Sequence, residues 1–403
     1  MRKETKKAPT IRFRGFTDDW EQRKLGEIFT ERSEKKHEYL PPLTIIQGCG
    51  TVRRDEMDRE LIYDKSSLSN YKLVKKNDFI VHLRSFEGGL EKSNIEGIVS
   101  PAYHIFHGEK INTEFYYSFF RSNDFINHKL VPFVYGIRDG RSIDIAGMKT
   151  IKIPYPSVNE QNHIGTLIGQ LNSLIALHQR KLSQLKKLKK YFLQNMFPAK
   201  GEKVPRIRFK GFTGDWEQRK LEDLASFSKG AGYSKSDLQA SGTPIVLYGR
   251  LYTKYETVIK DIDTFVDALA DSVYSQGGEV IVPASGETAE DISIASVVEK
   301  PGIVLGGDLN IIHPSDDLDS TFLAISISNG NPHKEMAKRA QGKSVVHLHN
   351  NDLAQIKLLY PSVTEQRKIS QYFSGLDTLI TLHQHKLDQL QTMKKFMLQN
   401  LFI

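Results

Sequence analysis

The chain contains Ile11-Arg-Phe-Arg-Gly-Phe-Thr-Asp-Asp-Trp-Glu-Gln-Arg-Lys-Leu25 and repeats it as Ile207-Arg-Phe-Lys-Gly-Phe-Thr-Gly-Asp-Trp-Glu-Gln-Arg-Lys-Leu221, with two residues changed. A second phrase, Tyr155-Pro-Ser-Val-Asn-Glu-Gln161, returns as Tyr360-Pro-Ser-Val-Thr-Glu-Gln366. The segments between these phrases do not match each other. The repeat is about 200 residues long, well beyond the roughly 50 residues of the longest solenoid units, and indicates duplication of a whole domain.

The composition is that of a globular protein, and its net charge suggests a polyanionic partner. Of 403 residues, 39% are hydrophobic and 26% are charged, and no apolar run approaches the roughly 18 residues of a membrane span. The N-terminus has no apolar signal segment, and Cys49 is the single cysteine, so we expect a cytoplasmic protein without disulfides or a cysteine-based metal site. The net charge of +8 is compatible with nucleic acid as partner.

A heptad pattern follows each Glu-Gln pair and predicts two long helices of roughly 35 residues, about 50 Å each. A narrow apolar seam requires a partner helix, so we expect the two copies to pack as an antiparallel coiled coil with pseudo-two-fold symmetry. The two central histidines are predicted to meet on this axis. The predicted helix interface comprises Ile164, Leu171, His178, Leu185, Ile369, Leu376, His383 and Leu390.

The two variable modules, residues 26–152 and 222–357, mix strand and helix signals. Phe79–Leu83, Val280–Pro283 and Asn310–Ile312 are predicted strands, and Glu114–Arg121 and Thr321–Ser328 are predicted helices. The expected fold class is α+β. The predicted domains are a first module with its repeated phrase (1–152), a central long helix (153–200), a second module (201–357) and a C-terminal long helix (358–403).

Catalytic motifs are missing from the sequence. Gly342-Lys-Ser344 has Ala337 where a P-loop requires glycine, and Ser285-Gly-Glu287 lacks the first glycine of a nucleophile elbow. Neither an S-adenosylmethionine loop nor an acidic metal motif is evident, and His347 with His349 is too small a set for a metal site. We therefore expect a protein that catalyses nothing by itself and binds no metal.

Clusters of basic and aromatic residues with glycine occur in both modules. Arginine reads guanine edges, while lysine and serine grip phosphates. A Gly-basic-Ser triplet recurs at 140–142 and 342–344, shortly before the shared Tyr-Pro phrase. The predicted DNA-binding residues are Arg53, Arg54, Arg84, Tyr135, Arg138, Arg141, Ser142, Lys229, Tyr233, Lys235, Tyr248, Arg250, Tyr252, Lys254, Arg339, Lys343, Ser344 and His347.

The pattern of repeats resembles the specificity subunit of type I restriction-modification enzymes. The resemblance rests on Gly15–Leu25 and its second copy, on the two Tyr-Pro-Ser entries with their Glu-Gln pairs, and on the helix ends Leu193-Gln-Asn-Met-Phe197 and Leu398-Gln-Asn-Leu-Phe402. It covers the whole chain in order. It does not transfer individual recognition residues, because these vary within the family.

The resemblance implies a non-catalytic reader of double-stranded DNA. Two target-recognition domains would each recognise one half of an asymmetric, interrupted site, and the helix pair would set their spacing. Two methylation subunits and two restriction subunits would be the partners. S-adenosylmethionine, ATP and magnesium would belong to those partners and not to this chain.

Two other classes of protein remain as alternatives. A self-contained methyltransferase or nuclease would require a cofactor loop or an acidic metal cluster. A scaffold that binds only proteins would show little salt dependence, whereas each phosphate contact adds a slope of about −0.9 to a plot of log affinity against log salt.

Overall fold

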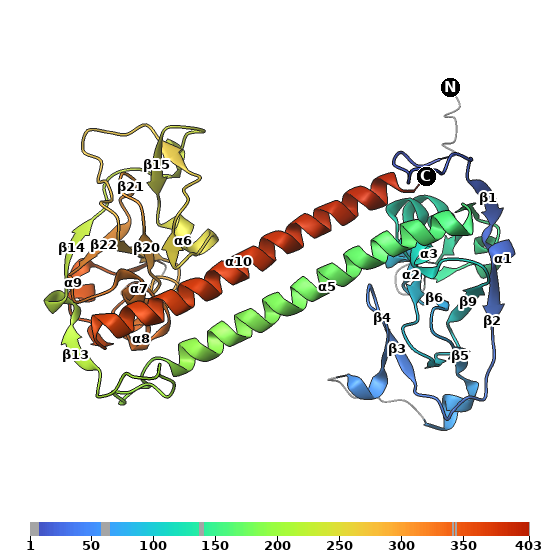
Figure 1. Cartoon of the computed structure of the whole chain (residues 1–403), viewed down its shortest axis with the longest axis horizontal. Coiled ribbons are helices and arrows are strands. Elements are labelled where there is room, and N and C mark those ends of the chain that lie inside the picture. The colour runs from blue at the N-terminus through green and yellow to red at the C-terminus, as the bar shows by residue number, and fades with distance from the viewer. Residues whose placement is uncertain (1–7, 58–64, 137–140, 341, 343–344, 403) are drawn as a thin grey trace. The chain divides into compact units, whose positions relative to one another are not determined.

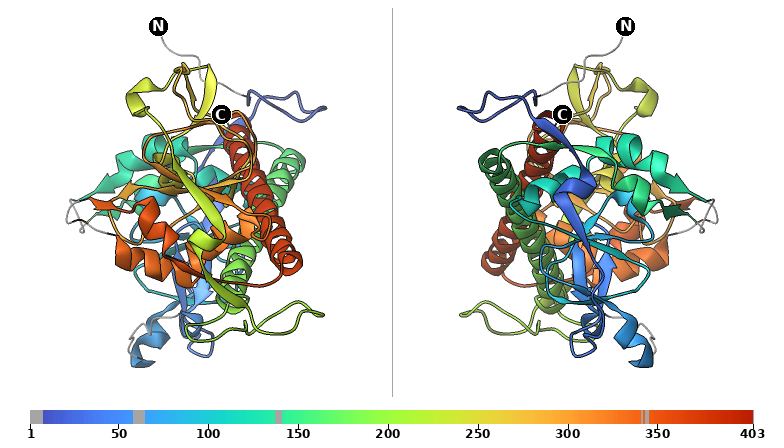
Figure 2. Two further views of the ribbon diagram at one scale, coloured as in Figure 1. Left: turned by 90° about the vertical axis from the view of Figure 1, so that its left-hand side faces the viewer. Right: turned by 90° about the vertical axis from the view of Figure 1, so that its right-hand side faces the viewer.

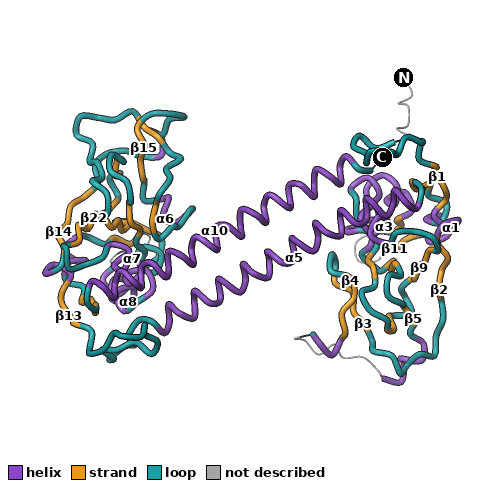
Figure 3. The backbone as a smooth tube through the Cα atoms, viewed as in Figure 1, coloured by secondary structure: helices purple, strands orange, loops and turns teal. Residues whose placement is uncertain are grey.

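The computed structural model describes residues 8–57, 65–136, 141–340, 342 and 345–402. The chain divides into two compact units, the first comprising Met1–Gln179 with His385–Ile403 and the second Arg180–Gln384. Each unit contains one variable module and a part of both long helices. Figure 3 shows strands, helices and loops mixed in both units, in agreement with the predicted α+β class.

The two long helices are α5 (Val158–Asn195) and α10 (Val363–Asn400), each of 38 residues. In the second unit, Lys189 of α5 forms an ion pair with Asp377 of α10, and Phe192 meets Tyr372 with 5.2 Å between ring centroids. Residue numbers rise along α5 as they fall along α10, so the helices run in opposite directions there. Both helices can be followed in Figures 1 and 2, α5 in green and α10 in red.

The predicted apolar seam is buried at most of its positions. Ile164 and Ile369 are each 1% exposed, and Leu171, Leu376 and Leu390 are buried as well; Leu185 is half-buried. Knobs-into-holes packing stays a prediction. So does the meeting of the half-buried His178 and His383, because the first belongs to the first unit and the second to the other.

The first unit is built on a four-stranded antiparallel sheet with the order β2-β9-β6-β7. Its strands are β2 (Phe29–Arg32), β9 (His104–Gly108), β6 (Phe79–Val81) and β7 (Glu91–Lys92). Three antiparallel pairs accompany the sheet: β3 (Leu43–Ile46) with β4 (Gly50–Arg53), β5 (Lys72–Val74) with β8 (Gly97–Val99), and β10 (Val134–Tyr135) with β11 (Ser142–Ile143). The short helices are α1 (Leu25–Ile28), α2 (Ser85–Gly88), α3 (Thr113–Phe120) and α4 (Ile145–Met148).

Aromatic side chains fill the core between this sheet and α3. Phe29 of β2 meets Phe79 of β6 edge to face, and both rings contact Phe120 of α3. Because α3 buries Phe115 and Phe119 as well, this helix of eight residues buries a large apolar surface. The predicted helix over Glu114–Arg121 is confirmed within one residue at each end.

The second unit repeats the sheet order although the sequence between the repeated phrases does not match. Its main sheet has the order β14-β22-β18-β20-β16. These strands are β14 (Ala225–Lys229), β22 (Leu309–Pro314), β18 (Glu279–Pro283), β20 (Ser296–Val298) and β16 (Val258–Ile259). The first four correspond in order and direction to the four strands of the first unit, so both modules share one framework.

Further elements of the second unit surround this framework. A smaller sheet joins β17 (Phe265–Val266), β15 (Thr243–Val246) and β21 (Val304–Leu305), and β19 (Ser285–Gly286) pairs with β23 (Val346–His347). The helices are α6 (Gly249–Thr253), α7 (Ser320–Asn329), α8 (Asn331–Arg339) and α9 (Asn350–Ala354). The predicted strands near Val280 and Ile311 and the predicted helix Thr321–Ser328 are confirmed.

The repeated phrases fasten each module to its helix start. β1 (Glu21–Lys24) pairs with β12 (Lys152–Tyr155), and β13 (Glu217–Lys220) pairs with β24 (Lys357–Tyr360) in the same register. Arg12 donates from Nε and Nη2 to the buried Glu160 carboxylate, at 2.7 and 2.9 Å. Arg208 repeats this bidentate pair with Glu365, at 2.7 Å for both contacts.

The glutamine of each Glu-Gln pair joins the helix start to the module. Gln161 accepts from Asn112 N and donates to Pro156 O, and Gln366 accepts from Asp319 N and donates to Pro361 O. Both amide side chains lie at the N-terminus of the helix that packs on the sheet, α3 in the first module and α7 in the second. The recurrence of Glu-Gln therefore reflects one structural joint used twice.

Within the described residues, no helix combines the length and the apolar character needed to cross a membrane.

Candidate nucleic-acid interface

Three loops converge in each module at the end of the sheet where the central strand, β6 or β18, finishes. Loop A follows β3 or β15 (residues 47–50 and 247–254), and loop B follows the central strand (82–89 and 284–291). Loop C carries the Gly-basic-Ser triplet and is described in part (135–136 with 141–142, and 340, 342 and 345–347). We call these six segments the recognition loops.

In the first module, α2 of loop B is the meeting point. Gln47 of loop A lies so close to Gly88 that a Cβ at residue 88 would overlap its Nε2. From the other side, the Arg141 guanidinium of loop C lies over the Phe86 ring, 5.5 Å from its centroid. Glycine at position 88 therefore permits the close approach that brings the three loops together.

A buried carboxylate fixes loop A of the first module. Glu91 has no exposed surface and accepts from Gly48 N (2.7 Å), Gly50 N (3.2 Å) and Tyr117 Oη (2.9 Å). Arg121 neutralises it through an ion pair. Burial raises the pKa of Tyr117, so its hydroxyl keeps the proton that it donates.

Loop B of the first module begins with a histidine held neutral. Burial, and then the positive charge of Arg121, lowers the pKa of His82 to about 4. A neutral ring accepts through Nδ1 from Arg84 N at 3.3 Å, which orients the start of α2. Arg84 itself is exposed and forms an ion pair with Glu87.

In the second module, hydrogen bonds join all three loops. The Tyr252 hydroxyl of loop A donates to Ser285 O of loop B at 2.8 Å. A Cβ at Gly286 would lie 2.9 Å from the Tyr252 hydroxyl oxygen. Ser285 stands opposite His347 of loop C in the β19–β23 pair. A cleft of about 1080 Å³ lies at these loops, and its lining includes Lys235, Tyr248, Tyr252, Glu287, Glu290 and Asp291.

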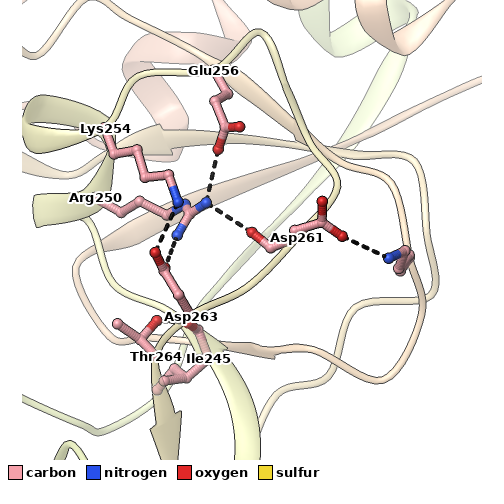
Figure 4. A network of polar contacts seen from close by, with 8 residues as sticks. Ile245, Arg250, Lys254, Glu256, Asp261, Asp263 and Thr264 are labelled. Atoms are coloured by element: carbon pink, nitrogen blue, oxygen red, sulfur yellow. Dashed lines mark hydrogen bonds and ion pairs between the residues drawn. The ribbon is translucent and has the colours of Figure 1, made fainter. Parts of the chain in front are cut away.

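Arg250 lies inside the fold of loop A and does not face the cleft. Its side chain is 7% exposed, and its guanidinium binds Asp263 Oδ1 (2.5 Å), Glu256 Oε2 (2.7 Å) and Asp261 O (2.8 Å), as Figure 4 shows. Because these contacts tie Arg250 to the segment that follows α6, the arginine stabilises this helix. Whether Arg250 also contacts DNA stays a prediction, but its guanidinium is buried and already bound by these partners.

The structure brings some predicted DNA-binding residues together and separates others. On or beside the recognition loops lie Arg84, Tyr135, Arg141, Ser142, Lys229, Lys235, Tyr248, Tyr252 and His347. Lys254 also lies on loop A but is ion-paired with Asp263. Arg138, Lys343 and Ser344 lie outside the described residues.

Four predicted residues lie away from the recognition loops. Arg53 and Arg54 stand at the opposite end of the β3–β4 hairpin from its turn, where Arg53 forms an ion pair with Asp55. Tyr233 accepts from Leu269 N beside the small sheet, and Arg339 lines a separate depression with Gln355 and Lys357. Whether any of the predicted residues contacts DNA stays a prediction.

Sequence reasoning missed Gln47, Glu91 and Arg121. Gln47 is an exposed amide in a short glycine-containing turn, and an amide side chain has the donor and acceptor needed to pair with an adenine edge. Glu91 and Arg121 are 30 residues apart in sequence and on different elements, so no spacing pattern links them.

The two modules share one sheet order, differ in their loops, and are each attached to a long helix by the same repeated contacts. This arrangement defines a class of proteins in which one scaffold carries two recognition modules. Residues 17–187 and 213–392 each match the family described as the type I restriction modification DNA specificity domain. The chain belongs to this family, which confirms the resemblance seen in the sequence. By its description, this family provides DNA specificity in type I restriction modification.

Two curated relatives come from Methanocaldococcus jannaschii. The chain is 24% identical over 266 residues to the type I restriction enzyme MjaVIII specificity subunit, which covers 63% of this chain and 61% of that relative. It is 22% identical over 415 residues to the putative type I restriction enzyme MjaX specificity subunit, covering 94% and 91%. The aligned part thus spans less than two thirds of the first relative and nearly all of the second.

A solved structure supports the fold independently of sequence similarity. The type I restriction-modification system S subunit from M. genitalium aligns with a TM-score of 0.61 at 13% identity, covering 98% of this chain and 99% of that one. The likeness therefore extends over both modules and both long helices.

Proposed function

We propose that this chain reads a bipartite, asymmetric DNA site and directs adenine methylation or cleavage by partner subunits to it. The observation that carries the proposal is the convergence of three recognition loops at the same place on both copies of one framework. The frameworks match, while the loops differ in sequence and in structure. Different loops read different half-sites, and the asymmetry of the site follows.

The helices α5 and α10 set the gap between the half-sites in this proposal. A helix of 38 residues rises about 57 Å, which corresponds to roughly 17 base pairs of duplex at 3.4 Å each. The fixed length of the helices would then give a fixed number of unread base pairs. Lengthening both helices by one turn should lengthen the gap without changing either half-site.

An exposed apolar stripe on each long helix is the proposed docking surface for the methylation subunits. On α5 it consists of Leu174, Leu177, Leu188 and Tyr191, and on α10 the equivalent positions hold Leu379, Leu382, Met393 and Phe396. Each of the eight side chains is at least 41% exposed. Two copies of one stripe are suited to two copies of one partner, hence two methylation subunits.

The partners supply the chemistry in this proposal. S-adenosylmethionine would be bound by the two methylation subunits, and ATP and magnesium would be used by two restriction subunits. The chain itself would act in the cytoplasm, where it meets duplex DNA.

The deciding experiment is to express the chain with candidate methylation subunits and to map methylated adenines across the host genome. We expect a new two-part motif with a fixed gap. A stable complex on the DNA that produces no two-part motif would contradict the proposal. A measured affinity that barely changes between low and high salt would instead favour the protein-binding scaffold.

The docking surface has its own test. Leu177→Glu should weaken the binding of one methylation subunit, and Leu382→Glu should weaken the other, so each variant should form complexes with a single subunit. Ser183→Glu adds the same charge at an exposed position on the other side of α5 and serves as control. Mass photometry gives the stoichiometry directly. Two subunits bound to each leucine variant would exclude the stripe as the interface.

A further inference from the structure

We propose that Glu91 and Arg250 are positioning residues for sequence reading, each of which fixes loop A of its own module and so sets the specificity of one half-site. Neither would touch DNA. The inference rests on the proposed function and adds to it an assignment of which buried groups hold the reading loops in place.

Glu91 acts as the centre of the loop A turn in the first module. Its two carboxylate oxygens take the backbone N–H groups of Gly48 and Gly50, which flank the exposed Cys49. Backbone groups in a short turn otherwise bind water and leave the turn free to rearrange. The carboxylate, fully buried and held by Arg121 and Tyr117, fixes the turn and thereby the exposed side chain of Gln47.

The register of this turn matters for reading. Gln47 packs against Gly88 of loop B, and a glutamine reads adenine only when its amide plane meets the base edge. A turn that loses its two carboxylate contacts can shift by more than the roughly 0.5 Å tolerance of a preorganised site. Loss of Glu91 should therefore affect discrimination more than overall binding.

Arg250 performs the equivalent task in the second module with the opposite charge. It belongs to loop A itself and ties α6 to the segment Glu256–Asp263 through three partners, while Lys254 binds the second oxygen of Asp263 at 2.8 Å (Figure 4). These contacts hold the pKa of Asp263 at about 2, so the carboxylate stays charged at any working pH. The helix so fixed carries Tyr252 and begins directly after Tyr248; the two rings lie 6.1 Å apart, and both residues line the cleft.

Glu91 belongs to the first unit and Arg250 to the second. Each half-site is therefore an internal control for the other. A change that merely destabilised the protein would lower methylation at all sites and leave the motif unchanged. A change in a positioning residue would relax one half of the motif and leave the other half intact.

The experiment maps adenine methylation genome-wide for complexes that contain the wild-type chain, Glu91→Gln or Arg250→Lys. Glutamine keeps the size of Glu91 but presents N–H groups to donors, and lysine keeps the charge of Arg250 but loses its planar fork. We expect each variant to raise methylation at sites with one mismatch in its own half-site about tenfold relative to cognate sites, as loss of a hydrogen bond to a charged group predicts. The two variants should relax opposite halves.

Matched variants keep the test decisive. Glu109→Gln and Glu299→Gln change exposed carboxylates in the same two modules and should leave the motif unchanged. If Glu91→Gln or Arg250→Lys yields no complex, Tyr117→Phe and Glu256→Gln remove one contact from each device and should give the same effect at smaller size. An unaltered motif in all four variants, or equal relaxation of both halves, would overturn the inference. A wild-type complex without any two-part motif would overturn the proposed function as well.

Discussion

The two joints that fasten the modules to the long helices are nearly the same, whereas the two sets of recognition loops have almost nothing in common. Arg12 with Glu160 and Arg208 with Glu365 form matching bidentate pairs, each with a carboxylate that is 2% exposed. Loop A, by contrast, is a turn around a buried glutamate in one module and a short helix around a buried arginine in the other. The repeated sequence therefore encodes the frame, and in our proposal specificity lies in the recognition loops, which differ between the modules.

The joints also differ in one hydrogen bond. Trp20 donates from Nε1 to Glu160 Oε2 at 3.0 Å, while the buried Nε1 of Trp216 has no hydrogen-bond partner among the described residues. A buried donor without a partner costs free energy of folding. The second joint is thus expected to be the weaker one, although its sequence is nearly identical.

The largest effect should come from a charge placed in the buried seam. Leu376→Asp and Leu171→Asp bury a carboxylate at positions that are 6% and 5% exposed. Each should lower the free energy of unfolding by more than about 4 kcal/mol, as measured by chemical denaturation. Leu379→Asp and Leu174→Asp place the same charge on exposed positions of the same helices and should change it by less than about 0.5 kcal/mol. Equal effects at buried and exposed positions would refute the assignment of the seam.

The comparison of the joints can be tested by removing their carboxylates. Glu160→Ala leaves Arg12 and Trp20 without their partner and should cost about 4 kcal/mol of stability. Glu365→Ala should cost about 1 kcal/mol less, because Trp216 donates nothing to this carboxylate. Thermal unfolding of both variants gives the ranking. A larger loss for Glu365→Ala would reverse our view of the two joints.

The role of the recognition loops in DNA binding can be tested through Arg141, which lies on loop C of the first module. Arg141→Ala should weaken DNA binding about tenfold and reduce the slope of log affinity against log salt by about 0.9, if the guanidinium meets one phosphate. Titrations at several salt concentrations measure both quantities. Lys260→Ala removes a cation that forms an ion pair with Glu299 outside the recognition loops and should leave the slope unchanged. Arg138, the other arginine predicted here, lies outside the described residues.

The smallest expected effect is a pH dependence of stability, which arises from a histidine of the first module. The pKa of His82 in the folded chain, about 4, lies below its ordinary value of 6.5. Between these values the unfolded chain binds the proton more readily, so this histidine stabilises the fold above about pH 6.5, and the stability is lost as pH falls toward 4. The melting temperature should fall by a few degrees more between pH 7 and pH 5 in the wild type than in His82→Gln. An identical shift in both proteins would show that His82 is not the responsible group.

Local patterns predicted the elements that local physics determines. The heptads after Glu160 and Glu365 predicted both long helices, and the apolar runs at Phe79 and Val280 predicted the central strands of the two sheets. Individual recognition residues were harder to predict from the sequence. Arg250 lies in a basic and aromatic cluster of the kind that predicts DNA contacts. Its acidic partners, Glu256 and Asp263, face it only in the folded chain.

By itself, the sequence determined the duplicated frame, the long helices, the α+β class and the family, because repetition and hydrophobic period can be read without knowing which distant residues meet. Tertiary structure alone decided which loops meet. Gln47 reaches Gly88, and Glu91 reaches the Gly48–Gly50 turn from 41 to 43 residues further along the chain. Such contacts form between different elements of the folded module, so the buried charges that hold the recognition loops became visible only in the tertiary structure.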